Sequence, residues 1–216
     1  MNELMEIDRI DFGKNNFCYH CNRKLIAKSY VVKINGEEVF FGSECIKEHF
    51  PIINKDIPNF IRASIDYEID PNKIKRTDTL EKNNTESLRR IIEYLRLRCE
   101  LLTDFYKIED KDITNIYLRH KNSKIDGDDK NYIYSLMEYF DKINPKFGYK
   151  NLMACYMAKN ILLLWIDNKN DDFAKSIFEN LKSKYYLTEK QIIGANNWIK
   201  NIKELKVING KWFYKK

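Results

Sequence analysis

Three cysteines and a histidine near the N-terminus have the residue types and the spacing of metal ligands. Cys18 and Cys21 form a C-x2-C pair, and Cys45 and His49 follow as a C-x3-H pair after 23 intervening residues. Thiolate and imidazole groups are the ligands that zinc prefers, and four of them complete its tetrahedral shell. Because a complete protein shell leaves no position for a catalytic water, the sequence predicts a structural zinc site at these four residues.

Two alternatives for the cysteines stay open at this point. They can be unmetallated, buried thiols of an intracellular protein, or they can form a disulfide, which needs an oxidising compartment. No secretory signal peptide precedes them, so the disulfide is the weaker alternative. His20 is the rival for the fourth ligand position, but its place between Cys18 and Cys21 favours a solvated surface histidine.

The residues between the two ligand pairs predict a β-hairpin. Tyr30–Ile34 and Glu38–Phe41 are rich in β-branched and aromatic residues. Asn35-Gly36 between them is a typical two-residue hairpin turn. The hairpin explains how the second ligand pair returns to the first.

A short helix is expected to carry the second pair. Gly42 ends the strand, Ser43 is a suitable N-cap, and Cys45 and His49 lie four residues apart on one helical face. A C-x2-C knuckle, a hairpin and a helix with the last two ligands form the plan of a treble-clef zinc finger.

Composition predicts a soluble globular protein with an uneven charge distribution. The chain has 216 residues, of which 44% are hydrophobic and 13% aromatic, enough for a sizeable core. No long apolar run or lipidation motif is present, so we expect a cytoplasmic protein with no membrane partner. Residues 1–167 contain 27 basic and 27 acidic side chains, whereas residues 168–216 contain 11 and 5. The net charge of +6 therefore lies entirely in the last part.

The pattern along the chain predicts an α+β fold that is mostly α. We expect a treble-clef zinc-binding unit at residues 1–50, followed by a helical bundle. Residues 51–84 form a connecting segment and linker, with a further short helix expected within 52–69. Residues 85–216 form a helical domain with a basic C-terminal helical hairpin and tail, separable from the finger.

The clearest helical pattern runs from residue 85 to about 108. Apolar residues recur there at helical spacing, which predicts one buried face. The opposite face carries oppositely charged residues four apart, which favours a solvated, salt-bridged surface. These pairs are Glu86–Arg90, Arg89–Glu93 and Arg96–Glu100.

Further helices are expected at 131–143, 149–167, 172–185 and 188–205, with 109–130 as a charged connection. The stretch 149–167 is apolar on nearly every side, which predicts a central buried helix. Thr188-Glu189-Lys190-Gln191 has the pattern of a capping box at a helix start.

Two stretches resemble parts of small phage-type proteins. Residues 17–49 resemble their treble-clef fingers, which show a C-x2-C-x-R-x-L knuckle and a Gly-x-x-Cys helix start. Residues 173–191, ending in Leu-Thr-Glu-Lys-Gln, are similar to a helical module found beside such fingers in phage nucleic-acid-processing proteins. The resemblance implies zinc ligation by Cys18, Cys21 and Cys45, whereas His49 as the fourth ligand rests on spacing.

No motif of catalysis stands out in the sequence. A Gly-rich phosphate loop, a G-x-S-x-G elbow and an H-E-x-x-H motif are all missing, and the carboxylates are dispersed among charged helices. We therefore expect a non-enzyme without a small-molecule substrate.

The first functional hypothesis is a zinc-stabilised accessory protein that binds nucleic acid or a nucleoprotein complex. C-terminal lysines beside aromatic residues suit phosphate neutralisation together with base stacking. The predicted nucleic-acid-binding residues are Lys200, Lys203, Lys206, Lys211, Trp212, Lys215 and Lys216. The alternative is a protein-binding inhibitor of a host defence complex, which would use the zinc hairpin and loops as a rigid surface.

Overall fold

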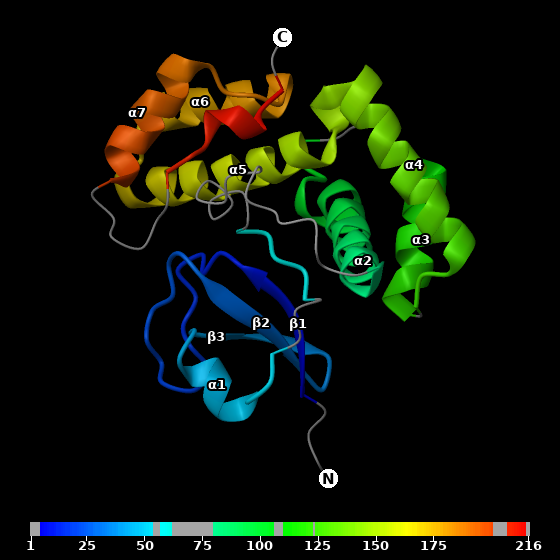
Figure 1. The fold of residues 1–216 in the computed structure, drawn as a ribbon. Helices are drawn as coiled ribbons and strands as arrows, with labels where there is room; N and C mark the ends of the chain where they lie inside the picture. The colour runs from blue at the N-terminus through cyan, green and yellow to red at the C-terminus, as the bar shows by residue number, and fades with distance from the viewer. Residues whose placement is uncertain are drawn as a thin grey trace.

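The computed structural model describes residues 5–53, 57–61, 80–105, 110–122, 124–200 and 207–214, and they form a mostly helical α+β fold. A small sheet and α1 lie on one side of α5, with α6 and α7 on the other (Figure 1). The strands are β1 (Met5–Asp11), β2 (Ser29–Ile34) and β3 (Glu37–Phe41). The helices are α1 (Cys45–His49), α2 (Leu80–Arg96), α3 (Lys111–Asn122), α4 (Gly127–Ile143), α5 (Tyr149–Lys169), α6 (Asp172–Lys184) and α7 (Glu189–Ile199). A π-helical turn (Leu97–Leu101) and two 3₁₀ turns (Pro145–Phe147, Gly210–Trp212) complete them.

The predicted hairpin is present. The three strands are antiparallel in the order β1-β2-β3, and β2 and β3 pair from Tyr30↔Phe41 to Ile34↔Glu37. Asn35 and Gly36 have φ angles of 52° and 91°, the left-handed region that a tight hairpin turn needs. The lead-in before the knuckle is strand β1, which has an irregularity between Ile7 and Arg9.

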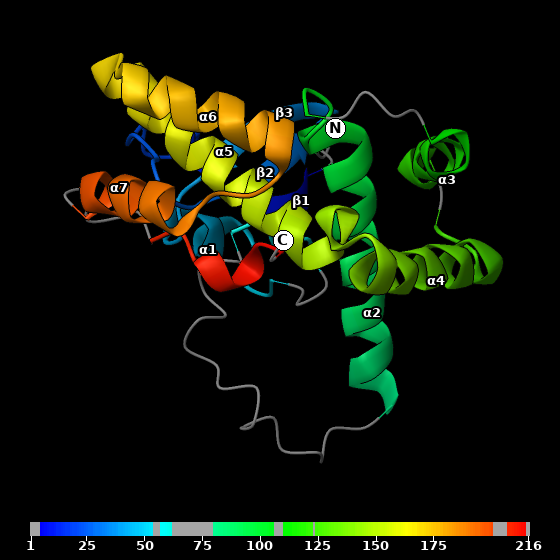
Figure 2. The ribbon, with the colours of Figure 1, turned by 90° about the horizontal axis from the view of Figure 1, so that it is seen from above.

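Helix α5 is the central helix that its apolar sequence predicts. Its buried residues lie all around the helix, so it contacts neighbours on every side. Figure 2 shows α6 running alongside it. No helix of the described residues is both long and apolar enough to cross a membrane.

Several helix limits differ from those expected. Helix α2 begins at Leu80, five residues before the expected start, and the charged stretch 109–130 holds α3 and the start of α4. Asp126 accepts a hydrogen bond from Asp129 N at 2.7 Å, so Asp126 is the N-cap of α4. In α3, Ile113, Ile116 and Tyr117 are buried at the i, i+3, i+4 spacing of one helix face, a short pattern that charged residues on both sides obscure.

The connection after α1 also differs from expectation. Residues 57–61 are a bend, a bridge and a turn, where a short helix was predicted, and residues 62–69 of that prediction lie outside the described part. Ile10 N donates to Pro58 O at 2.8 Å, and Phe60 N donates to Ile10 O at 3.0 Å. The segment therefore extends the free edge of β1. Ser43 is not the cap of α1, because the N-cap is Glu44, without a side-chain hydrogen bond.

The sheet and α1 have a small buried cluster of their own, and a second, larger cluster joins segments beside the sheet to the helices. Phe12, Phe60 and Ile61 belong to the same buried cluster as the helical residues. The rings of Phe60 and Tyr156 are 5.7 Å apart in an edge-to-face contact. The predicted boundary near residue 84 is therefore crossed by core contacts.

A buried carboxylate of β1, Asp11, fastens the sheet to α5. The Tyr156 hydroxyl donates to its two oxygens at 2.9 and 3.0 Å, and Lys14 Nζ lies 3.3 Å from Oδ2. Asp11 is 1% exposed, and Phe12 N donates a further hydrogen bond to it. Because a buried carboxylate is stable only when its oxygens are bonded, these contacts fix strand and helix together.

Asp8 makes a second link, to α2. Arg96 donates to both of its oxygens at 2.7 Å, Lys33 lies 2.9 Å away and Arg9 2.6 Å away. Burial alone would raise the pKa of the Asp8 carboxyl, but these cations, Arg96 first, hold the pKa far below its usual range. The carboxylate therefore stays charged while buried.

The charged face of α2, which the sequence predicts to be solvated, packs against other elements at Glu93 and Arg96. Glu93 is fully buried, accepts a hydrogen bond from Asn59 N at 2.7 Å and another from the Tyr149 hydroxyl. Its expected partner Arg89 lies 3.8 Å away. Arg96 bonds Asp8 of the sheet. The Arg89–Glu93 pair is therefore confirmed, but the prediction of a solvated face is wrong for Glu93 and Arg96, because tertiary partners bury the charges.

Replacement of Asp8 by Asn should destabilise the chain strongly. The substitution leaves Arg96 and Lys33 without their shared carboxylate, beside Arg9, which keeps Glu38, and this costs about 3 kcal/mol in a buried site. Urea denaturation at neutral pH measures the change in unfolding free energy.

Lys47→Ala is the matched control, since Lys47 and Glu44 form an exposed pair worth at most about 1 kcal/mol. The pKa of Asp8 is lower in the folded chain than in the unfolded one. Its contribution is therefore complete above a pH of about 4 and declines as pH falls further. Equal losses in both variants would contradict the role given to Asp8.

Candidate metal centre

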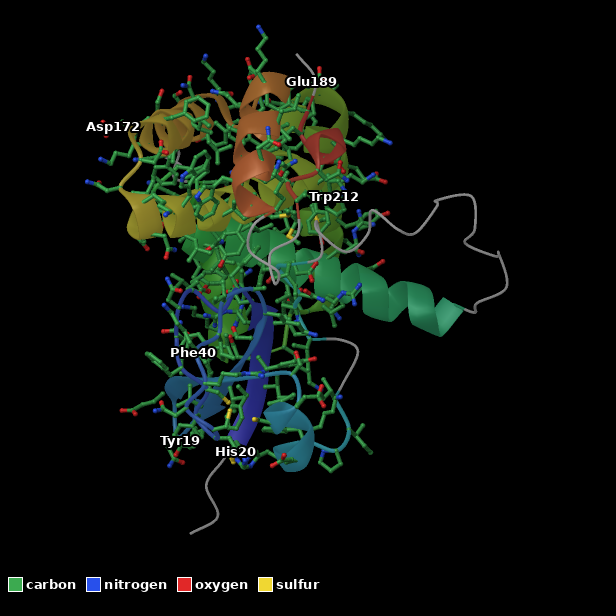
Figure 3. The ribbon with its side chains drawn as sticks, turned by 90° about the vertical axis from the view of Figure 1, so that its left-hand side faces the viewer. Tyr19, His20, Phe40, Asp172, Glu189 and Trp212 are labelled. Carbon is green, nitrogen blue, oxygen red and sulfur yellow. The ribbon has the colours of Figure 1, made fainter. Side chains whose placement is uncertain are left out.

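The C-x2-C knuckle is a tight turn held by backbone hydrogen bonds. Asn22 N donates to Cys18 O and Cys18 N donates to Arg23 O, both at 2.8 Å. Asn22 adopts a φ of 56°, a left-handed conformation that asparagine tolerates better than most residues. The turn places the two cysteines at one end of the hairpin, and Figure 3 shows Tyr19 and His20 there, at the end away from the helices.

The structure brings the three predicted cysteine ligands together. The sulfurs of Cys18, Cys21 and Cys45 all lie within 4.8 Å of one another, and Cys45 Sγ is 3.5 Å from Cys21 Sγ. Helix α1 begins at Cys45 and so supplies the third sulfur from its first turn. All five cysteines of the chain are free thiols. The three clustered cysteines are thus positioned to bind a metal ion.

The surroundings of the sulfurs favour a thiolate at one position. Burial alone would raise the pKa of Cys18, but backbone N–H groups of Cys21, Gly42 and His20 outweigh it and lower the pKa to about 7. Gly42 N lies 3.4 Å from Cys18 Sγ. Hydrogen bonding to Cys21 raises the pKa of Cys45 to about 12. A divalent cation bound among the three sulfurs would favour the thiolate form of Cys45 and so the loss of its proton.

The two nearby histidines lie beside each other. His49 Nε2 is 3.0 Å from His20 Nδ1, and His20 Nε2 is 3.2 Å from a Glu48 oxygen. Among the described residues, the group of close ligand atoms consists of the three cysteines, without His49. His20 is solvated, as expected. Its contact with His49 was not expected, because sequence spacing does not show which residues face each other across the hairpin.

The predicted nucleic-acid-binding residues are only partly within the described chain. Lys200 and Lys211 are exposed, and Lys200 Nζ lies 3.4 Å from Asn197 Oδ1. Lys203, Lys206, Lys215 and Lys216 lie outside the described residues. Figure 3 shows Trp212 beside the helices, far from the knuckle residues Tyr19 and His20.

The aromatic tail is packed onto the helices. Ile208 and Phe213 are buried, and Trp212 is half-buried against the core. The Asn196 amide binds both Ile208 N and Ile208 O, at 2.7 and 3.0 Å. Tyr214 N donates to Asn151 Oδ1 at 2.9 Å. Phe213 therefore belongs to the core, and Trp212 keeps only part of its ring accessible.

A hollow of about 710 Å³ lies away from the cysteines, between β1 and the α2–α3 side. Its wall includes both partners of the Asp8–Arg96 ion pair and both partners of the Glu100–Tyr117 hydrogen bond. The first pair joins the sheet to α2, and the second joins the π-helical turn to α3, so these groups already bind each other. The cysteine cluster is therefore the stronger candidate site.

The chain was also compared with known proteins. No protein-family model matches it, and neither the curated proteins nor the solved structures include a match. The charge distribution of the sequence and the geometry of the described residues are therefore the basis for the function proposed below.

Proposed function

We propose that this chain is a non-enzymatic, zinc-stabilised accessory protein of the phage or mobile-element type, which binds nucleic acid or a nucleoprotein complex. The observation that carries the proposal is the charge distribution: residues 168–216 contain 11 basic and 5 acidic side chains. A concentrated positive charge binds a polyanion by releasing its counterions. Lys200 and Lys211 are exposed in this region, as such binding requires.

The metal in this proposal is zinc, and the surrounding fold is a treble-clef finger. Three sulfur ligands favour a soft metal, and the β2–β3 hairpin lies between the knuckle and α1, as that plan requires. His49, one helical turn after Cys45, supplies the fourth ligand. With four protein ligands, the metal stabilises the fold and supplies no chemistry.

We expect the purified protein to hold one zinc per chain. Cys45→Ala should abolish this content and unfold the N-terminal part, because the apparent binding energy of structural zinc is on the order of 10 kcal/mol. Elemental analysis and circular dichroism measure the two effects. Cys99→Ser is the control and should keep its zinc, since Cys99 lies outside the cluster. A folded, unchelated sample with well under half an equivalent would contradict the proposal.

The two histidines should differ in their effect on zinc affinity. His49→Ala removes a zinc ligand. His20→Ala removes a neighbour that orients the His49 ring, and a change of this kind lowers the metal affinity about 10- to 100-fold. Competition with a chromophoric chelator measures both affinities. A larger loss for His20→Ala than for His49→Ala would exchange the two roles.

The C-terminal lysines test the nucleic-acid proposal. Replacing Lys200, Lys203 and Lys206 by Ala should flatten the salt dependence of binding to single-stranded DNA by two to three phosphate contacts, or about 1.4 to 2.1 in logarithmic slope. Trp212→Ala should cost about 1–3 kcal/mol if the accessible part of its ring stacks on a base. Fluorescence anisotropy across a salt series measures both.

The control triple variant replaces Lys124, Lys142 and Lys150, which are exposed lysines outside residues 168–216. It should leave the slope unchanged, because those lysines make no phosphate contact in the proposal. Failure of the native chain to bind any nucleic acid at low salt would end the proposal.

The second candidate function is a protein-binding inhibitor of a host defence complex. Tyr132, Tyr139 and Ile143 are 42%, 53% and 68% exposed, and their spacing places them on one face of α4. An exposed apolar stripe of this kind favours a protein partner over a polyanion. Capture of a protein partner that persists at high salt and is lost in Tyr139→Glu would favour this candidate.

A further inference from the structure

A small basic pocket lies beside the cysteine cluster. It has a volume of about 310 Å³ and is lined by Arg23, Lys24, Lys28, residues 25–27, Gly42 and Ser43. The lining contains three cationic side chains and no carboxylate. Gly42 lies in the pocket wall and also donates its N–H to Cys18 Sγ, so the wall contacts the C-x2-C knuckle.

The three cations of this pocket have no acidic partner within the described part of the chain. Lys28 Nζ lies 4.7 Å from the centre of the Tyr30 ring, a contact that leaves its positive charge uncompensated. The cations of the sheet–helix junction differ, since Arg9 and Arg96 are both bound to carboxylates. Three uncompensated charges around a concavity attract an anion.

An exposed aromatic ring adjoins the pocket. Phe17 is 59% exposed and forms an antiparallel bridge with Lys24, so its side chain and that of a pocket residue project from directly opposed positions. Tyr19 is 60% exposed two residues later and lies at the outer end of the sheet (Figure 3). Rings that stay in water beside uncompensated cations have the composition of a single-strand binding surface.

We propose that this pocket binds a backbone phosphate of single-stranded nucleic acid, with the adjacent base stacked on Phe17. The inference rests on the proposed function and adds a contact in the N-terminal part, apart from the C-terminal lysines. A single strand suits the site because its unpaired bases can turn toward an exposed ring, whereas those of a duplex are already stacked. The metal-held knuckle positions the pocket wall and the ring.

The test measures the binding of labelled oligothymidine to the full zinc-loaded chain. Replacing Arg23, Lys24 and Lys28 by Ala should flatten the logarithmic salt slope by about 0.7, the contribution of the one phosphate that the pocket holds. Phe17→Ala should weaken binding about 5- to 150-fold, and its loss should vanish on an abasic oligomer. An unchanged slope or an unchanged affinity for Phe17→Ala would overturn the inference.

Two controls distinguish phosphate binding in the pocket from a general loss of positive charge and from a loss of the metal. The triple variant of Lys124, Lys142 and Lys150 carries the same charge change and should keep the native slope. The pocket variants should also retain one zinc and the native melting temperature. Loss of binding only in samples that have lost zinc would mean that the cations serve the metal centre, and it would overturn the inference.

The remaining arms identify the source of the phosphate. Inorganic tripolyphosphate at equal phosphate concentration should displace oligothymidine poorly, because it offers no base to Phe17. Equal displacement would overturn the assignment to nucleic acid. If the native chain binds no nucleic acid, the proposed function fails as well. If it binds and only the C-terminal variants weaken it, the inference about the pocket fails alone.

Discussion

The burial of two carboxylates in one short strand constrains the whole arrangement of sheet and helices. A charged group leaves water only where cations or donors replace its hydration, and Asp8 and Asp11 obtain these from separate elements. Asp8 takes Arg96 from α2, and Asp11 takes the Tyr156 hydroxyl from α5. Apolar packing alone would allow the sheet to slide over the helices, whereas these directional bonds fix one relative position. These bonds therefore hold the sheet, together with its cysteine cluster, in one position against the helices.

The elements with strong local signals could be predicted from the sequence. The Asn35-Gly36 turn, the capping box at Thr188 and the apolar helix α5 each follow from neighbouring residues, and all three are present. The inner position of Glu93 and Arg96 could not be predicted, because the partner Asp8 of Arg96 is 88 residues away. On a single sequence, charges four apart look the same whether they face water or another element.

The cysteine cluster could be predicted because metal ligands have characteristic types and spacing. The basic pocket could not, because Arg23, Lys24 and Lys28 do not differ in sequence from the other basic residues of the chain, 38 in all. What distinguishes them is that the fold gathers them around one concavity whose described lining contains no carboxylate. Likewise, three aromatic residues in the tail gave no indication that Phe213 enters the core while Trp212 keeps part of its ring accessible.

The separation of partners along the chain has a consequence for the order of folding. The cysteines of the cluster are close in sequence, with Cys21 and Cys45 24 residues apart, so the hairpin and a bound metal can form early on the ribosome. Asp11 must wait for Tyr156, 145 residues later. Until the helices have been synthesised, the carboxylates of Asp8 and Asp11 stay solvated on β1, whose outer edge pairs with the segment 57–61 at Ile10. Those charges keep the nascent sheet in water and oppose edge-to-edge association, a protection that ends when the helices bury them.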